Sequence, residues 1–230
     1  MGCQAVNIWA CKYSLSECIS PPTAARGLIS KNSTHIKNIV HLPSGQRCAV
    51  EVGYGGDNPT SPLLLDGTGQ AIPNLGRQEI RLIHDNIPKQ RLIKDPKMWI
   101  YQYRNGPEDD WHSAYSFAEL EWFQEDVDVL NLFAHGYTQR RTVLVVRFLR
   151  EGEDVQFSSN SRLPLKNDIR IVKKVMLVDN VVKVNLGGRK SVMHSFDSGD
   201  GRLQALAYYF GIFLTDEEAQ SIRGWHKELG

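Results

Sequence analysis

Apolar and polar residues alternate along several short stretches of the chain, and this period of two is typical of half-buried β-strands. The alternation begins near residue 36 and predicts strands over 36–42, 46–52, 78–84, 98–103, 142–149, 169–178 and 181–186. Before it, the helical spacing of Ile8, Cys11, Leu15 and Cys18 predicts a helix over residues 7–20, which ends before Pro21.

The C-terminal part of the chain predicts two helices. The first covers residues 202–210 and stops at Gly211, a residue that suits a helix end. The second opens with a capping box, in which Thr215 and Glu218 each satisfy a free amide of the other. An acidic and aromatic segment, residues 117–123, predicts a helical turn. A helical start, an antiparallel β middle and a mixed C-terminal part make an α+β arrangement.

Residues 36–52 predict a β-hairpin around Pro43-Ser44-Gly45, where Gly45 takes the left-handed position of a three-residue loop. In this register Lys37 faces Glu51, and His35 faces Gly53. Because side chains alternate along a strand, the hairpin has two faces. The expected apolar face holds Ile36, Val40, Leu42, Cys48, Val50 and Val52, and the expected polar face holds His35, Lys37, Ile39, His41, Arg47 and Glu51.

The polar face brings together groups that can activate a nucleophile. His35 and Glu51 are diagonal neighbours, roughly 7–8 Å apart at the backbone. Cys3 supplies a thiol upstream, and a thiol beside an imidazole and a carboxylate forms a reactive thiolate. In the alternative interpretation, Glu51 only pairs with Lys37 on a solvated surface, an interaction worth under about 1 kcal/mol.

Composition narrows the function classes. The chain has 230 residues, enough for one or two domains, with 41% hydrophobic and 23% charged residues, as in soluble globular proteins. A formal net charge of +1 favours neither a nucleic acid nor a membrane as partner. The sequence contains no membrane-length apolar run and no secretory-signal pattern, so we expect a cytoplasmic protein. The four cysteines lack zinc-site spacing, and we expect no metal.

An ordered set of motifs covers nearly the whole chain. The hairpin is followed by the motif Pro59–Leu63. Further short motifs of the same set occur at Glu79–Leu82, Trp99–Gln102, Phe210–Ile212 and Ile222–Gly224. Together with Val50–Gly56, this set resembles the arylamine N-acetyltransferase family, most closely its fungal type. The resemblance implies a cysteine-protease-like fold with a partial N-terminal helical bundle, an antiparallel β-barrel and a C-terminal α/β lid. The corresponding domains are residues 1–32 (a remnant of the helical domain with the candidate nucleophile), 33–135 (the barrel) and 136–230 (the lid).

The resemblance also implies a ping-pong reaction. A cysteine takes the acyl group from acetyl-CoA or another acyl-CoA, and a small arylamine-type acceptor removes it. Cys3 stands four residues before Asn7 and matches the family nucleophile, while His35 matches the base and Glu51 the usual Asp. Gly53, Gly55 and Gly56 match the glycine-rich turn, where the backbone can approach the cofactor closely, although a bulged strand end is equally consistent with them.

The chain departs from the family pattern at three points. Met1-Gly2 leads directly into Cys3, so we expect the N-terminal helical segment to be missing. Ala5 stands where the family has Glu or Gln, and Glu51 replaces Asp. Two alternatives therefore stay open. One is a truncated, catalytically inactive family member that binds CoA or a partner, and the other is a Cys-His-Glu hydrolase.

Overall fold

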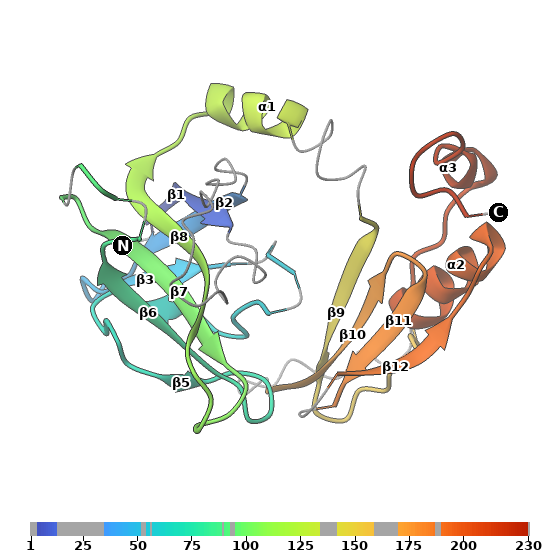
Figure 1. Ribbon diagram of the computed structural model, residues 1–230, viewed down its shortest axis with the longest axis horizontal. Helices are drawn as coiled ribbons and strands as arrows, with labels where there is room; N and C mark the ends of the chain where they lie inside the picture. Colours follow the sequence, from blue (N-terminus) through green and yellow to red (C-terminus); the bar gives the residue numbers. More distant parts are fainter. Residues whose placement is uncertain are drawn as a thin grey trace. The chain divides into compact units, whose positions relative to one another are not determined.

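The structure is a computed structural model of the chain, and it describes residues 4–12, 35–51, 54–55, 57–88, 90–92, 95–133, 142–158, 170–186 and 190–229. For residues 4–12, 35–36 and 133 it describes the backbone alone. The chain divides into two compact units, Met1–Leu132 and Phe133–Gly230. Each unit contains one β-sheet (Figure 1).

The first unit is an eight-stranded antiparallel sheet in the order β4-β3-β2-β1-β8-β7-β6-β5. Over the described residues this sheet is open, so the expected closed barrel is not found. Its two edge strands contain only two residues each, and Pro73 in β5 has no amide N–H with which to extend the hydrogen bonding. The strands are β1 (Gln4–Lys12), β2 (His35–His41), β3 (Arg47–Val50), β4 (Leu63–Leu64), β5 (Ile72–Pro73), β6 (Glu79–Asp85), β7 (Met98–Arg104) and β8 (His112–Glu121).

Strand β1 corrects the prediction for the N-terminal segment. The helix expected over residues 7–20 is wrong for residues 7–12, which belong to β1, while residues 13–20 lie outside the described part. In the centre of the sheet, Val6 is opposite Ile39 of β2, and Ala10 is opposite both His35 of β2 and Phe117 of β8. Backbone hydrogen bonding to two neighbouring strands outweighs a weak local preference for helix.

The predicted hairpin is confirmed in its register. Leu42 donates its amide to the carbonyl of Gln46 and Gly45 donates to Leu42, both at 2.9 Å. Gly45 has a φ of +85°, the left-handed conformation that the three-residue loop requires. Along the strands, Asn38 is opposite Val50 and Val40 is opposite Cys48, as the loop length predicts. The turn therefore determines which side chains share a face.

Burial does not follow the expected apolar and polar faces of this hairpin. Ile39 and Lys37, both on the expected polar face, are buried, and Ile39 belongs to the hydrophobic core together with Ala49 of β3. On the expected apolar face Cys48 is buried, but Val40 and Val50 are only half-buried. The face with more charged residues thus points inward, because the aromatic side chains of β7 and β8 complete the core on that side. That core consists of Ile39, Ala49, Leu63, Leu65, Ile80, Leu82, Trp99, Tyr101, Tyr103, Ala114, Tyr115 and Phe117.

Strand β8 and helix α1 also differ from prediction. The helical turn expected over residues 117–123 is wrong through Glu121, because β8 continues to that residue. Phe117 is buried and is opposite Trp99 of β7, so cross-strand pairing decides its conformation. Helix α1 (Gln124–Phe133) follows, with Glu125 and Asp126 in its first turn, where negative charge favours a helix.

The second unit has a four-stranded antiparallel sheet in the order β12-β11-β10-β9. The strands predicted over 142–149, 169–178 and 181–186 are confirmed with small changes at their ends, and the edge strand β12 was not predicted. Its exposed positions, including a lysine and two serines, lack the alternation that marks the other strands. The bounds are β9 (Leu144–Arg150), β10 (Ile171–Val178), β11 (Val181–Asn185) and β12 (Lys190–Ser195).

The C-terminal helical segments of this unit are largely as predicted. Helix α2 (Gly199–Ala205) continues into the π-helical turn η3 (Leu206–Phe210), which stops at Gly211 in the left-handed conformation. Helix α3 (Asp216–Gln220) has the complete capping box, with Glu218 accepting the Thr215 amide at 2.8 Å. The core packs one face of the sheet against α2 and η3, through Val175, Leu177, Val182, Phe196, Ala205, Leu206 and Phe210.

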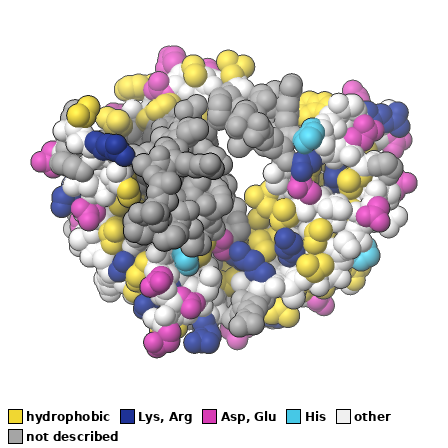
Figure 2. All heavy atoms as spheres, viewed as in Figure 1, with side chains coloured by type: hydrophobic (Ala, Val, Ile, Leu, Met, Phe, Trp, Pro, Cys, Tyr) yellow, Lys and Arg dark blue, Asp and Glu magenta, His cyan; other side chains and the backbone are white. Residues whose placement is uncertain are grey.

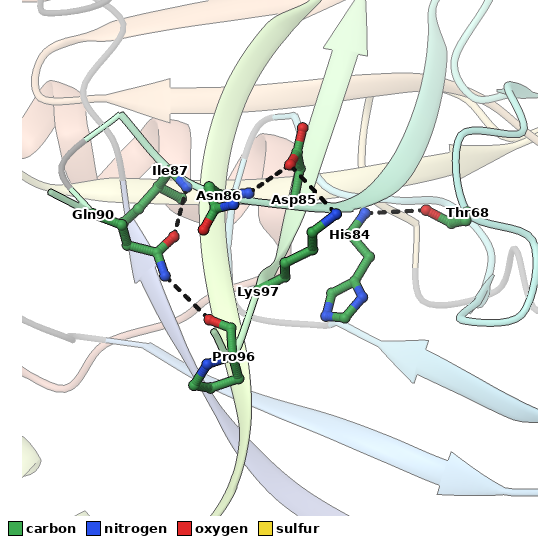
Figure 3. A network of polar contacts seen from close by, with 8 residues as sticks. All are labelled: Thr68, His84, Asp85, Asn86, Ile87, Gln90, Pro96 and Lys97. Atoms are coloured by element: carbon green, nitrogen blue, oxygen red, sulfur yellow. Dashed lines mark hydrogen bonds and ion pairs between the residues drawn. The ribbon is translucent and has the colours of Figure 1, made fainter. Parts of the chain in front are cut away.

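The loop between β6 and β7 is closed by its own polar contacts (Figure 3). Gln90 accepts the Ile87 amide at 2.7 Å and donates to the Pro96 carbonyl at 3.1 Å. At the start of the loop, Asp85 accepts the Asn86 amide at 2.8 Å. These contacts all lie within residues 85–96, so they stabilise the loop itself.

We expect Gly211→Ala to destabilise the chain more than Gly224→Ala. Both glycines have positive φ, +66° and +75°, so each alanine costs about 1 kcal/mol of backbone strain. A Cβ at Gly211 would also overlap the ring of Phe157, whereas one at Gly224 meets nothing within 4 Å. The Phe157 ring is 37% exposed and can move aside, so the clash should add about 0.5–1.5 kcal/mol. Urea unfolding of both variants checks this, and equal losses would contradict the packing of Phe157 on Gly211.

Candidate functional site

The described structure contains part of the predicted site. Glu51 directly follows β3, and Gly55 lies in the turn that comes next. His35 begins β2, where its backbone is opposite that of Ala10, but its side chain is outside the described part. Three further predicted residues also lie outside the described part: Cys3, Gly53 and Gly56.

A buried lysine lies at the centre of the described site. Lys37 precedes Asn38 in β2 and Glu51 directly follows Val50 at the end of β3, so both lie beside the bridge pair Asn38–Val50. The Lys37 ammonium donates a hydrogen bond to the hydroxyl of Tyr115. Its Nζ also lies near the centres of three aromatic rings, where a cation is attracted to the π electrons. The ring centres are 4.5 Å away for Tyr115, 5.1 Å for Phe117 and 5.7 Å for Tyr101.

The surroundings of Lys37 disfavour its charged form. Burial lowers the pKa of Lys37 to about 7, while the negative charge of Glu51 acts in the opposite direction. Lys37 is 0% exposed and Glu51 is 9% exposed. The alternative of a solvated Lys37–Glu51 surface pair is therefore wrong, because both residues are in the interior.

Three tyrosines surround this pair and remain protonated at neutral pH. Burial raises the pKa of Tyr54, Tyr101 and Tyr115 above the usual value. Tyr101 donates to the backbone carbonyl of Asp57 at 2.8 Å, and the Tyr54 ring lies 4.9 Å from that of Tyr115. The aromatic cluster thereby connects β7 and β8 to the turn that follows Glu51.

The turn itself depends on a glycine and a buried amide. Gly55 has a φ of +103°, which a residue with a side chain rarely adopts, and its carbonyl accepts the Asn58 amide at 3.2 Å. The side-chain nitrogen of Asn58 donates to the backbone carbonyl of Glu51 at 3.4 Å. The chain thus returns to Glu51 within a few residues, and this limits the freedom of its backbone.

A second amide braces the turn against the sheet. Asn74 accepts the Thr60 amide at 2.8 Å and donates to the Asn58 carbonyl at 3.1 Å and to Gln78 at 2.7 Å. Gln78 is buried and donates to Asn105 at 3.2 Å. One connected hydrogen-bond network therefore fixes the segment after Glu51, which is how precise sites are usually supported.

The register of β1 bears on the predicted nucleophile. Gln4, the residue after Cys3, is opposite His41, whereas Ala10 is opposite His35. Six residues of strand extend about 20 Å. The described backbone therefore places Gln4 and His35 at opposite ends of the β1–β2 pair.

Several residues of this site were not predicted. Tyr101, Tyr115 and Phe117 come from β7 and β8, far from the hairpin in sequence. Tyr101 lies within the family match Trp99–Gln102, but neither it nor the other two was assigned a place at the site. Lys37 was expected only as a cross-strand partner of Glu51. One local feature of the sequence was available. Lys37 and Ile39 lie two residues apart on the same face of β2, and a lysine is rarely buried next to an apolar residue in this way.

The described residues contain no cluster of three or more His, Cys, Asp or Glu side chains placed to hold a metal ion. Within the same part of the chain, no helix is long and apolar enough to cross a membrane.

On the face in Figure 2, acidic and basic side chains are interspersed over both units. Among the described residues on this face, no large area carries a single charge.

Comparison with known proteins supports the fold. No family model matches the chain. Similar solved structures include an arylamine N-acetyltransferase of Salmonella typhimurium (19% identical, 96% of this chain and 68% of that one, TM-score 0.67). That of Mycobacterium marinum, solved in complex with CoA, is 21% identical over 92% of this chain and 63% of that one, with a TM-score of 0.61. The resemblance inferred from the sequence is thus confirmed for the fold.

Two further comparisons carry functional information about other proteins. A Bacillus cereus arylamine N-acetyltransferase, described as having a Cys-His-Glu catalytic triad, is 18% identical over 92% of this chain and 67% of that one, with a TM-score of 0.59. In sequence, the chain is 23% identical to the N-malonyltransferase FDB2 of Fusarium pseudograminearum over 82% of this chain and 53% of that protein. The chain spans about half the length of the curated relatives it matches.

We expect Asn74→Ala to destabilise the first unit by about 2–3 kcal/mol, because it removes three hydrogen bonds and leaves partly buried partners unpaired. Asn86→Ala is the matched control, since the buried side-chain oxygen of Asn86 has no hydrogen-bond partner in the described structure. Urea unfolding measures both variants. An equal effect of the two would mean that Asn74 does not brace the turn.

We expect the wild-type chain to become more stable between about pH 7 and pH 9. The folded pKa of Lys37, about 7, is below its ordinary value of 10.5, so in this range the unfolded chain binds more protons and stability rises with pH. The free energy of unfolding should rise by at most about 1.4 kcal/mol per pH unit. Urea unfolding at several pH values should show a steeper rise for wild type than for Lys37→Met. Parallel curves would exclude a depressed pKa at Lys37.

Proposed function

We propose that the chain is an acyl-CoA-dependent N-acyltransferase that moves an acetyl or related acyl group to an arylamine-type acceptor. In this proposal Cys3 is the nucleophile, His35 the base and Glu51 the carboxylate that orients the imidazole. The acyl group is held as a cysteine thioester between the two half-reactions.

Each step conserves atoms and charge. His35 takes the proton of Cys3, and the thiolate attacks the thioester carbonyl of acyl-CoA. The carbon–sulfur bond to CoA breaks, and CoA leaves as a thiol with the proton from His35. The amine then attacks the acyl-cysteine, and His35 takes a proton from the amine. The bond between the acyl carbon and the Cys3 sulfur breaks, the amide departs, and His35 returns the proton to that sulfur.

Two kinds of likeness support this proposal. The fold is that of arylamine N-acetyltransferases, one of which binds CoA, and the curated relatives are N-malonyltransferases. The Bacillus cereus enzyme provides a precedent for glutamate as the carboxylate of a catalytic triad with cysteine and histidine. Malonyl-CoA is therefore tested beside acetyl-CoA as the donor.

The observation that carries the proposal is the burial of Glu51 directly after a hairpin that begins with His35. A carboxylate on a solvated surface would be screened by water, whereas a buried one interacts strongly with a neighbouring imidazolium. The hydrogen-bond network of Asn58 and Asn74 fixes the backbone beside it.

The glycine-rich turn is the proposed site of CoA approach. Gly55 adopts a backbone conformation that excludes most side chains, and Gly53 and Gly56 flank it in sequence. We also propose that residues 33–135 carry the base and carboxylate and that residues 136–230 serve as the lid.

One observation favours a second candidate function, a catalytically inactive protein that binds CoA or a partner. The β1–β2 register puts Gln4 across from His41 and not from His35. Acylation of Cys3 with the help of His35 requires residues at the start of β1 to leave this register. The two candidates therefore differ in whether the chain becomes acylated.

We expect incubation with acetyl-CoA or malonyl-CoA to add one acyl group to the chain, located on Cys3 by peptide mass spectrometry. Cys3→Ala should remove the adduct, and His35→Ala should slow its formation by at least about a hundredfold. Cys48→Ala, which changes a buried cysteine elsewhere in the sheet, is the control.

Adding an arylamine should remove the acyl group as an amide. Release into water without amide would indicate the hydrolase instead. Absence of any adduct with both donors would contradict the enzyme and favour the binding protein.

A further inference from the structure

A pair of arginines lies on the outer face of the first sheet, away from the aromatic core. Arg81 of β6 lies between Ile80 and Leu82, which are both core residues, so its side chain is on the opposite face. The central carbon of the Arg81 guanidinium is 4.1 Å from the ring centre of Trp111, and that of Arg104 in β7 is 4.7 Å from the same ring. Two positive charges therefore share one indole.

Only one of these two charges is matched by a carboxylate. Arg104 donates from its Nε to Glu79 at 2.6 Å and forms a salt bridge with it. Among the described residues Arg81 forms no ion pair, and the acidic residues 108–110, which precede Trp111 in sequence, do not pair with it. Burial and the nearby charge of Arg104 both lower the pKa of Arg81. An anion from outside would relieve the repulsion between the two guanidinium groups.

The Arg81 guanidinium is held in a fixed orientation. Its Nε donates to the side-chain oxygen of Gln102 at 2.8 Å, and Gln102, which is 9% exposed, donates in turn to the Ser113 hydroxyl at 3.0 Å. The two Nη groups of Arg81 have no hydrogen-bond partner among the described residues, and neither is buried. A buried amide and the Trp111 ring thus position a guanidinium whose outer edge can still donate hydrogen bonds.

We propose that Arg81 binds the carboxylate group of a small acid at this outer face, through its two Nη groups. A guanidinium presents its N–H groups in one plane and with the spacing of two carboxylate oxygens, so it can donate two parallel hydrogen bonds. One unmatched positive charge suits an anion with one negative charge. The site is on the opposite face of the sheet from the core that surrounds Lys37, and the inference does not depend on the proposed function.

An arginine that only covers Trp111 would behave differently. Stacking of a guanidinium on an indole requires no anion. Acetate would then bind Arg81 no better than it binds an exposed arginine such as Arg91 in the loop between β6 and β7. In the proposed site, Gln102 and Trp111 restrict the guanidinium before the ligand arrives, so less conformational entropy is lost on binding.

The test follows the arginine Nε and Nη signals of the full chain by nitrogen NMR, while sodium acetate replaces sodium chloride at constant ionic strength. Arg81→Gln assigns the signals of Arg81. We expect Arg81 to saturate at an acetate concentration at least about tenfold lower than Arg91 does, the ratio that one charge-assisted hydrogen bond provides. Arg150→Gln, which changes an arginine paired with Glu153 in the second unit, should leave the Arg81 midpoint unchanged.

Two variants test whether the fixed orientation matters. Gln102→Ala keeps Arg81 but removes the acceptor of its Nε, and it should raise the acetate midpoint of Arg81 about tenfold. Ser113→Ala removes only the partner of Gln102 and repeats the measurement in case the first variant does not fold; it should raise the midpoint by less.

Equal acetate midpoints for Arg81 and Arg91 would overturn the proposal and leave the stacking on Trp111 as the role of Arg81. Unchanged midpoints in both the Gln102 and the Ser113 variants would overturn it as well, because binding would then not need the positioned guanidinium. A lower midpoint for inorganic phosphate than for acetate would overturn the assignment to a carboxylate. Acylation has no part in these measurements, so their outcome is independent of whether the chain is an acyltransferase.

Discussion

The first unit is organised around the enclosure of two opposite charges on the inner face of the β2–β3 hairpin. An ammonium group and a carboxylate in a protein interior are tolerated only when each has compensating neighbours. Here the lysine donates a hydrogen bond to a tyrosine hydroxyl and lies close to three aromatic rings, and the negative charge of Glu51 favours its ammonium form. The aromatic residues of β7 and β8 are therefore both the hydrophobic core and the environment of the candidate site.

The segment after the hairpin shows how this enclosure is kept rigid. Asn58 and Asn74 tie the turn to Glu51 and to the rest of the sheet, and Tyr101 holds the carbonyl of Asp57. Such a connected network fixes the backbone more firmly than isolated contacts do. A carboxylate that must orient another group benefits from this, since small displacements strongly reduce rates.

Local patterns predicted the features that depend on neighbouring residues. Pro43, Ser44 and Gly45 determine the loop type, and the loop length then determines the hairpin register, so both were predictable. The same holds for the capping box at Thr215 and the helix end at Gly211. The helix over residues 7–12 was wrong because β1 hydrogen-bonds to strands on both sides, a contribution that no local pattern contains.

The sequence by itself determined the hairpin, the positions of His35 and Glu51 on it, and the likeness to a known family of folds. Only the tertiary structure decided which face of the hairpin is inside. The alternation of side chains along a strand shows which residues share a face, but not which face is buried. The core forms on the side where other strands provide apolar surface, and here Tyr101, Tyr115 and Phe117 provide it on the side of Lys37. Burial, and with it the charge state of the site, is therefore a property of the assembled sheet.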